Sequence, residues 1–212
     1  MSCLNTPSGR VHHHCIMEEL LTFINEVTDN FILKGGTALM LCYNLNRFSE
    51  DLDFDGTGST SIFDLLDTFC KKHGYWCRKA KDTNTTKRVI LHYQVEDKEA
   101  TLKIEVSYRK AYVETTVING YLTYSIDRIF NLKCNALKGR DRIRDLYDVL
   151  YLYSEYKSSL SHESVDDITT ALSYKDYDVI ADMIETCADP LINKRELENL
   201  YLSICSELEI IV

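Results

Sequence analysis

The stretch from Phe31 to Gly56 constrains this chain most, because it joins two features that handle phosphate and metal through one predicted helix. A short apolar run, Phe31–Leu33, is typical of a strand, and Gly35 and Gly36 follow it closely. Two adjacent glycines let the backbone take positive φ and approach a ligand. A helix that begins just after them, predicted over residues 38–46, directs free N–H groups to the same point, which suits a phosphate.

Two carboxylates end this stretch. Asp51 and Asp53 are two positions apart, so on a strand both side chains lie on one face. Paired oxygen ligands beside a phosphate cradle suit a Mg²⁺ ion that holds a nucleoside triphosphate. A Gly-Gly pair is weak evidence by itself, and so is a single Asp-x-Asp. The two joined by one helix are a much stronger signal.

Length and composition favour an ordinary globular protein. The chain has 212 residues, of which 45% are hydrophobic and 27% charged, enough for one large domain or two small ones. No apolar run approaches the ~20 residues of a membrane span, and the N-terminus has no signal-peptide core. We therefore interpret the 8 scattered cysteines as reduced thiols and expect a cytoplasmic protein that does not contact membrane.

Residue patterns predict a mixed α/β half to about residue 120, followed by an all-helical half. We expect residues 1–15 to be irregular, with His12–His14 in a surface loop, because consecutive histidines cannot all face one metal ion. A helix is predicted over Ile16–Asn30, and another over Ser61–Gly74 with Ser61 as N-cap and Gly74 as C-cap. The expected fold class is α+β, a mixed sheet with flanking helices followed by a helical bundle.

A hairpin is predicted from Arg88–Val95 and Ala100–Ser107, with Glu96–Glu99 as its turn. In the second strand Lys103, Glu105 and Ser107 share the face opposite the apolar residues. Glu105 is therefore placed like a third carboxylate beside the sheet. An exposed strand charge explains it equally well.

Charge is unevenly distributed. The net charge is −9, and the residues after position 150 contain 4 Lys and Arg against 13 Asp and Glu. Within the balanced first part, the segment Lys71–Arg88 holds seven basic residues and a single acid, Asp82. Such a segment can contact a nucleic-acid backbone. A solvated helix end and hairpin is an equal alternative.

The helical half contains a polar cluster. Lys133 lies among apolar residues, and Asp145 and Asp148 share one face of the next predicted helix, close to Arg140 and Arg144. Local salt bridges would explain the pattern and are slightly favoured by the residues alone. The alternative is a set of cations that meets triphosphate charge and is oriented by carboxylates.

Three blocks of the chain resemble the AbiEii/AbiGii toxin family, whose members are nucleotidyltransferases related in fold to DNA polymerase β. The blocks read LKGGTALMLCYNLNRFSEDLDF, KIEVS and LKCNALKGRDRIRDLYDVLYL, and they span residues 31–150 in the expected order. The resemblance implies a nucleotidyltransferase core over residues 1–120 and a helical domain over 121–212 that completes the active-site cleft. Members are commonly toxins with a cognate antitoxin, and some add nucleotides to the 3′ end of tRNA.

The resemblance also implies residue roles. In the first block, Asp51 and Asp53 would bind Mg²⁺ or Mn²⁺, and in the second block Glu105 would be the third acidic position. The residues that would hold the NTP triphosphate are Lys34, Gly35, Gly36, Thr37 and Arg47. In the third block, Lys133 would contact the phosphates, while Asp145 and Asp148 would orient that lysine or the acceptor.

The expected function is Mg²⁺-dependent transfer of an NMP from an NTP to an acceptor, expected to be RNA of the tRNA class, by a toxin. The basic residues expected to hold that RNA are Lys79, Lys81, Lys87 and Arg88. One alternative is a phosphatase of the haloacid-dehalogenase type, because residues 53–57 read DFDGT, with Asp53 as nucleophile and Asp55 as general acid. Another is a non-catalytic module that keeps the nucleotidyltransferase fold and binds nucleotides or partners.

Overall fold

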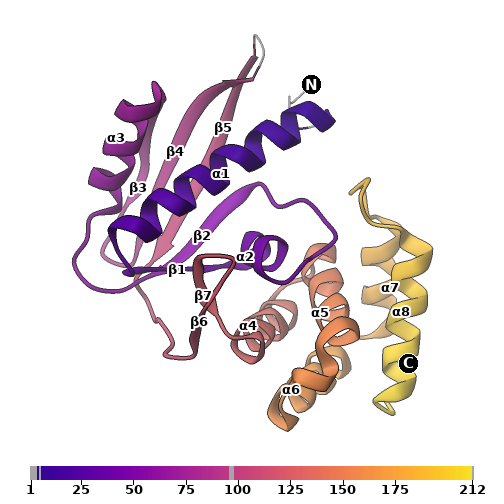
Figure 1. The fold of residues 1–212 in the computed structure, drawn as a ribbon. Coiled ribbons are helices and arrows are strands. Elements are labelled where there is room, and N and C mark those ends of the chain that lie inside the picture. Colours follow the sequence, from indigo (N-terminus) through magenta and orange to yellow (C-terminus); the bar gives the residue numbers. More distant parts are fainter. Residues whose placement is uncertain (1–3, 5, 96–97, 212) are drawn as a thin grey trace. The chain divides into compact units, whose positions relative to one another are not determined.

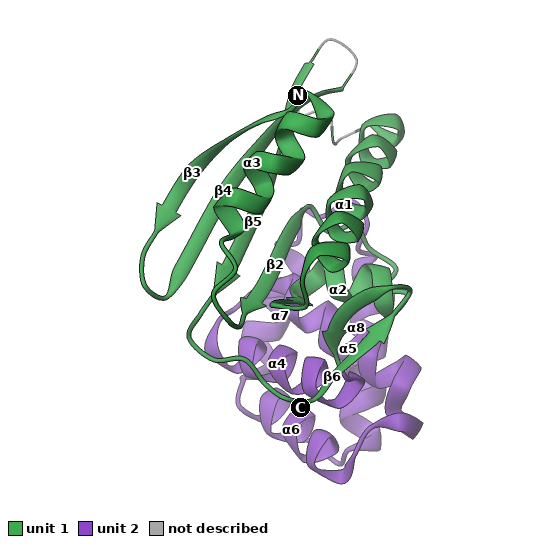
Figure 2. Cartoon of the chain, turned by 60° about the vertical axis from the view of Figure 1, so that its left-hand side comes forward, with its two compact units in different colours: residues 1–124 green, residues 125–212 purple. Residues whose placement is uncertain are grey.

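The structure is a computed structural model that describes residues 4, 6–95 and 98–211. It divides into two compact units, residues 1–124 and 125–212 (Figure 2). The predicted boundary at residue 120 precedes strand β7 (Tyr121–Tyr124), which belongs to the sheet of the first unit. Each unit is described separately below.

The first unit is built on a seven-stranded mixed sheet in the order β3-β4-β5-β2-β1-β7-β6 (Figure 1). Strand β2 runs parallel to β5 and β1 parallel to β7, whereas the other neighbours are antiparallel. The sheet and its helices confirm the predicted α+β fold class. The elements are α1 (Pro7–Val27), β1 (Phe31–Lys34), α2 (Gly35–Cys42), β2 (Asp51–Gly56), α3 (Ile62–His73), β3 (Trp76–Asp82), β4 (Thr86–Val95), β5 (Lys98–Ser107), β6 (Thr115–Ile118) and β7.

Alternation along the central strands gives the sheet an apolar face and a polar face. Leu52 and Phe54 of β2 are buried, and the alternating residues Asp51 and Asp53 point to the opposite side. Helices α1 and α3 pack on the apolar face, where they contact each other through Phe23 and Phe69 (Figures 1 and 2). The opposite face, which carries Asp51 and Asp53, is called the carboxylate face below.

Some boundaries agree with the sequence-based prediction and others do not. Ser61 caps α3 through the backbone N–H of Asp64, and Gly74 ends that helix at φ +72°, as predicted. The predicted hairpin forms as β4 and β5; its expected turn is outside the described residues at Glu96 and Asp97, and Lys98–Glu99 already belong to β5.

The prediction that residues 1–15 are irregular is wrong for the described part. Helix α1 begins at Pro7, and the hydroxyl of Thr6 caps it by accepting the N–H of Gly9 at 3.1 Å. Proline is tolerated at this first position because the missing N–H would have no helical partner there. His12–His14 are consequently on a helix and not in a surface loop.

His13 is fully buried and connects α1 to the sheet. Its Nε2–H donates to the carbonyl of Glu50 at 2.9 Å, immediately before β2. Its Nδ1 therefore accepts from the hydroxyl of Tyr93. Burial lowers the pKa of His13, so the ring is neutral and can fill both roles. This link fixes the backbone that leads into Asp51.

The His13→Ala variant is expected to lose about 1–3 kcal/mol of unfolding free energy, because it leaves the Glu50 carbonyl and the Tyr93 hydroxyl without this partner. Urea unfolding followed by circular dichroism measures the change. The exposed neighbour provides the control, since His12→Ala should change stability much less. Equal losses in the two variants would show that the ring of His13 has no special structural role.

The second unit is helical, as predicted. It comprises α4 (Ile126–Gly139), α5 (Ile143–Tyr156), a short 3₁₀ turn η2 (Lys157–Ser159), α6 (His162–Ser173), α7 (Tyr177–Glu185) and α8 (Lys194–Glu207). Ser125 and Ser161 cap α4 and α6 with their hydroxyls. The apolar faces of these helices form a core of their own, with Phe130, Leu146 and Ile168 buried. Among the described helices of both units, none has an apolar stretch sufficient to cross a bilayer.

Candidate active site

The glycine turn lies directly against the carboxylates. Gly35 has φ +75°, a left-handed conformation that favours glycine, and a Cβ there would be 3.0 Å from Oδ2 of Asp53. A Cβ on Gly36 would be 2.8 Å from Oγ of Ser49 and 3.0 Å from Nη2 of Arg47. Only glycine fits both positions without displacing these polar groups.

Helix α2 begins at Gly35, three residues earlier than predicted. Gly35, Gly36 and Thr37 therefore form its first turn, and no side chain caps that turn. N–H groups of a first turn have no partner within the helix, and they carry the positive end of the helix dipole. The turn can therefore bind an anion beside Asp53.

The other residues predicted to hold the triphosphate have contacts of their own. The buried hydroxyl of Thr37 donates to the backbone carbonyl of Asp51 and can accept from the hydroxyl of Ser49 at 2.9 Å, so its side chain is already engaged. The ammonium group of Lys34 pairs with the buried carboxylate of Asp55. Arg47 is 7% exposed, and its guanidinium lies beside Gly36.

Strand register brings the predicted carboxylates together. Asp53 stands directly opposite Glu105 in the parallel pair of β2 and β5, and Asp51 stands opposite Lys103. Burial raises the pKa of the Asp53 carboxyl, and the negative charges of Asp51 and Glu105 raise it further against the opposing effect of Lys103. Burial and the two neighbouring carboxylates thus outweigh the effect of Lys103 on the pKa of Asp53.

Two basic side chains form ion pairs with Asp51 and Glu105, the carboxylates that neighbour Asp53. Lys103 pairs with Asp51, and Arg88 pairs with Glu105 through Nε at 2.6 Å and Nη2 at 2.5 Å. Within the described residues, no three His, Cys, Asp or Glu side chains already form a set of metal ligands.

Lys103 was not predicted as a site residue. Its place two residues before Glu105, on the same strand face, was the signal that could have identified it.

The residue types at this point fit a divalent metal ion. Asp51 and Asp53 supply hard oxygen ligands, which Mg²⁺ prefers, and the half-buried Asp53 lies beside Asp51 and Glu105, whose negative charges a cation would offset. Asp51 and Asp53 would hold the ion. Glu105 could also bind the ion once its hydrogen bond with Arg88 is broken.

The four basic residues predicted to bind nucleic acid divide between the two faces of the β3–β4 hairpin. The ammonium groups of Lys79 and Lys87 lie 4.3 and 5.8 Å from the ring of Phe63 in α3, on the apolar side of the sheet. Lys87 also pairs with Asp82. Lys81 and Arg88 are opposite each other on the carboxylate face, after a bulge in β3.

In the second unit, the structure brings together the three predicted residues of that unit. Nζ of Lys133 in α4 lies 2.6 Å from Asp148 and 3.9 Å from Asp145 in α5. The guanidinium of Arg140 donates two hydrogen bonds, of 2.6 and 3.0 Å, to the carboxylate of Asp145. Asp148 is fully buried and Lys133 is 8% exposed. The two carboxylates therefore hold the lysine in one orientation.

Replacing Lys133 by Met is expected to lower the unfolding free energy by about 3–5 kcal/mol, because it removes the ammonium group that faces the buried charge of Asp148. Adding Asp148→Asn should recover at least half of that loss, since the double variant has no buried carboxylate at this position. Thermal unfolding of all four members of the cycle measures the coupling. Simple addition of the two single effects would show that the pair is not coupled.

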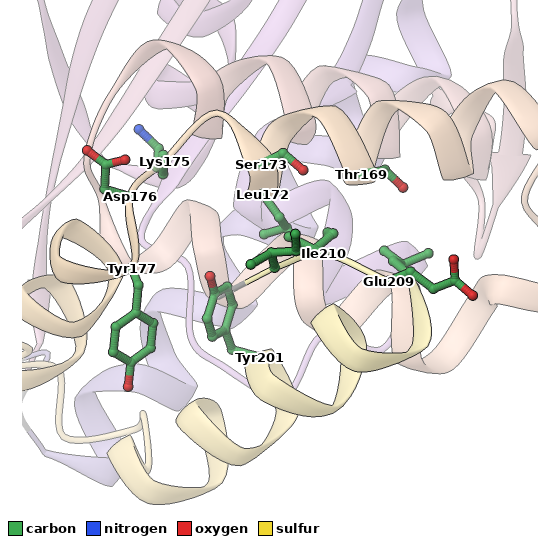
Figure 3. Close-up of a pocket in the computed structure, with 11 residues that line it drawn as sticks. Thr169, Leu172, Ser173, Lys175, Asp176, Tyr177, Tyr201, Glu209 and Ile210 are labelled. Carbon is green, nitrogen blue, oxygen red and sulfur yellow. The ribbon is translucent and has the colours of Figure 1, made fainter.

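Two hollows in the described structure are lined by other residues. One in the second unit, of about 420 Å³, lies among α6, α7, α8 and the residues after α8, where Tyr177, Tyr201 and Lys175 line it (Figure 3). The other, of about 520 Å³, lies in the first unit between α1 and the end of α3. Neither includes a residue that the sequence predicted to be part of the site.

Comparison with known proteins gives three findings. A family model described as "Nucleotidyl transferase AbiEii toxin, Type IV TA system" matches residues 20–203. The crystal structure of JHP933 from Helicobacter pylori is 27% identical with a TM-score of 0.75, over 94% of this chain and 93% of that chain. A crystal structure described as a candidate nucleotidyltransferase from H. pylori is 28% identical with a TM-score of 0.75, over 94% and 96%. Of the curated proteins, none matches significantly.

Proposed function

Because the chain belongs to the AbiEii family of nucleotidyltransferase toxins of type IV toxin–antitoxin systems, we propose that it transfers an NMP from an NTP to an RNA acceptor, with tRNA as the preferred class. The family match confirms the resemblance found in residues 31–150 and extends it to residue 203. The chain is a nucleotidyltransferase, so the phosphatase and the non-catalytic module are no longer the best explanations.

The observation that supports this function best is the packing of the Gly35–Gly36 turn against Asp53. In our proposal the first-turn N–H groups of α2 bind the triphosphate, with Arg47 beside them. Asp51 and Asp53 hold a divalent ion, Mg²⁺ or Mn²⁺, and Glu105 is the third acidic group. When bound, the ion would neutralise phosphate charge and lower the pKa of the attacking hydroxyl.

The helical unit contributes Lys133 to the phosphates of the nucleotide in this proposal. Its ammonium group is held in one orientation by Asp148 and Asp145, which reduces the entropy lost when it meets a ligand. A positioned cation of this kind stabilises the charge that develops as the 3′ hydroxyl of the acceptor displaces pyrophosphate.

Asp55 does not have the surroundings of a general acid. It is 2% exposed, and its two oxygens are taken by Lys34 and by the hydroxyl of Tyr124, the latter at 2.8 Å. These contacts tie β1, β2 and β7 together on the carboxylate face. They give Asp55 a structural role, where the phosphatase alternative would have required a free proton donor.

The proposed RNA acceptor is held on the carboxylate face of the hairpin, where Lys81 and Arg88 lie. Lys79 and Lys87 are left out of this proposal, because they contact Phe63 on the other face. The type IV family also implies an antitoxin, which we propose as a functional partner of this chain.

The variants Asp51→Asn and Asp53→Asn are each expected to reduce transfer by more than about 100-fold, because they remove charged metal ligands while keeping the side-chain shape. Labelled NTPs are incubated with Mg²⁺, the protein and total cell RNA, and label in RNA is counted. Asp67→Asn in α3 is the matched control, since its carboxylate is exposed and pairs only with Lys71 among the described residues. Transfer at the wild-type rate in both site variants would contradict the assignment.

A further inference from the structure

Trp76 stands on the edge strand of the sheet with half of its surface in solvent. It begins β3, the first strand in the sheet order, and it is 53% exposed. One face of its indole stacks on the imidazole of His92, with ring centroids 3.5 Å apart and planes 10° apart. His92 is in turn fixed by a contact of 2.8 Å between Nδ1 and Glu99. The indole is therefore held rigidly while it remains open to solvent.

Strand register places Trp76 on the carboxylate face. Residues directly opposite each other in neighbouring strands share a face. Trp76 pairs with His92, and two residues further along Arg78 pairs with Ile90, which pairs with Lys103. Lys103 stands opposite Asp51. The indole therefore lies three strands away from β2, which is about 14 Å by strand spacing. Along the strand direction it is two residues away from Arg78, the β3 residue that is level with Asp51.

The charges that β3 itself places on this face are positive, and one carboxylate, that of Glu99, lies nearby against His92. Arg78 and Lys81 are exposed side chains of β3, and neither forms an ion pair with any described residue. Cations on an edge strand also discourage pairing with other sheets, which would explain them without a ligand. Edge protection does not explain an exposed tryptophan, however, because a large apolar ring increases the tendency to associate.

We propose that Trp76, backed by His92, is a stacking platform for an unpaired base of the RNA acceptor, with Arg78 and Lys81 against the adjacent phosphates. Single-stranded RNA is commonly recognised by bases stacked on aromatic rings beside a basic surface. The platform is on the same face as Asp51 and at a distance that a few nucleotides span. This inference rests on the proposed function, because it assumes that the acceptor is RNA.

The chain itself provides a direct probe. Trp76 is the only tryptophan in the sequence, so intrinsic indole fluorescence reports this one position. The probe ligands are a single-stranded oligoribonucleotide, the same sequence as a duplex, and inorganic polyphosphate. We expect saturable quenching by the single strand, weaker quenching by the duplex and none by polyphosphate, which has charge but no bases.

Matched variants separate stacking from charge. Affinity for a labelled single strand should fall about five- to 150-fold in Trp76→Ala and be largely restored in Trp76→Phe, which keeps an aromatic ring. Arg78→Ala with Lys81→Ala should reduce the slope of log affinity against log salt by about 1.4 if each loses one phosphate contact. Lys79→Ala, on the same strand but the opposite face, should leave both affinity and slope unchanged.

The outcomes distinguish this inference from the proposed function. In one outcome NTP label enters RNA, but the single strand does not quench the indole and binds the Trp76→Ala variant as tightly as the wild type. The platform is then wrong, and the RNA acceptor assignment stands. Equal quenching by polyphosphate would also overturn stacking. If label enters a protein band and the single strand does not bind, both the RNA acceptor and the platform are wrong. If Lys79→Ala weakens binding as much as the double variant, the face assignment is wrong.

Discussion

Gly35 lies so close to Asp53 that a methyl group in place of its hydrogen would be 3.0 Å from a carboxylate oxygen. This approach depends on the left-handed backbone at Gly35, which lets β1 pass directly into α2. The same turn brings the first N–H groups of α2 to the carboxylates, so an anion bound there and a cation bound to Asp51 and Asp53 would be neighbours. The other features of the first unit support this geometry: His13 fixes the backbone before β2, and Thr37 fixes it at Asp51.

Electrostatics explains why the carboxylates can coexist on one face. Asp51 and Glu105 are each paired with a cation, whereas Asp53 between them is half-buried, and desolvation raises the pKa of its carboxyl. A divalent ion at Asp53 would offset the charges of Asp51, Asp53 and Glu105 together. Lys103 and Arg88 would then be released from Asp51 and Glu105 and be available to phosphate. In this proposal, the cations that pair with the carboxylates before binding would contact the ligand's phosphates afterwards.

The sequence was sufficient for the parts of the fold that short-range patterns determine. Alternation in β5 correctly separated Glu105 from Ile104, and Ser61 and Gly74 correctly marked the ends of α3. Helix α1 was mostly predicted but its start was missed, although Thr6–Pro7 is a common N-cap and N1 pair. The burial of His13 could not be predicted, because its partners are 37 and 80 residues away along the chain.

The site was predictable in its residue types and less so in its contacts. Spacing grouped Asp51 with Asp53, but the pairing of Lys103 with Asp51 depends on the register between β2 and β5, which periodicity leaves open. The basic segment shows the same limit. Its charge was visible in the sequence, but a bulge between Lys79 and Lys81 changes which residues share a face, because a shift of one residue reverses the direction of the side chains.

That bulge has a functional consequence within the hairpin. Without it, strict alternation would place Lys79 and Lys81 on one face, and Trp76 and Arg78 on the other. With it, Lys79 lies over Phe63, while Lys81 joins Arg78 and Trp76 on the carboxylate face. An edge strand with one extra residue therefore presents an aromatic ring and two cations to the same side as Asp51. In the proposed platform both cations would then lie beside the stacked base, whereas a regular strand would keep only Arg78 on the side of Trp76.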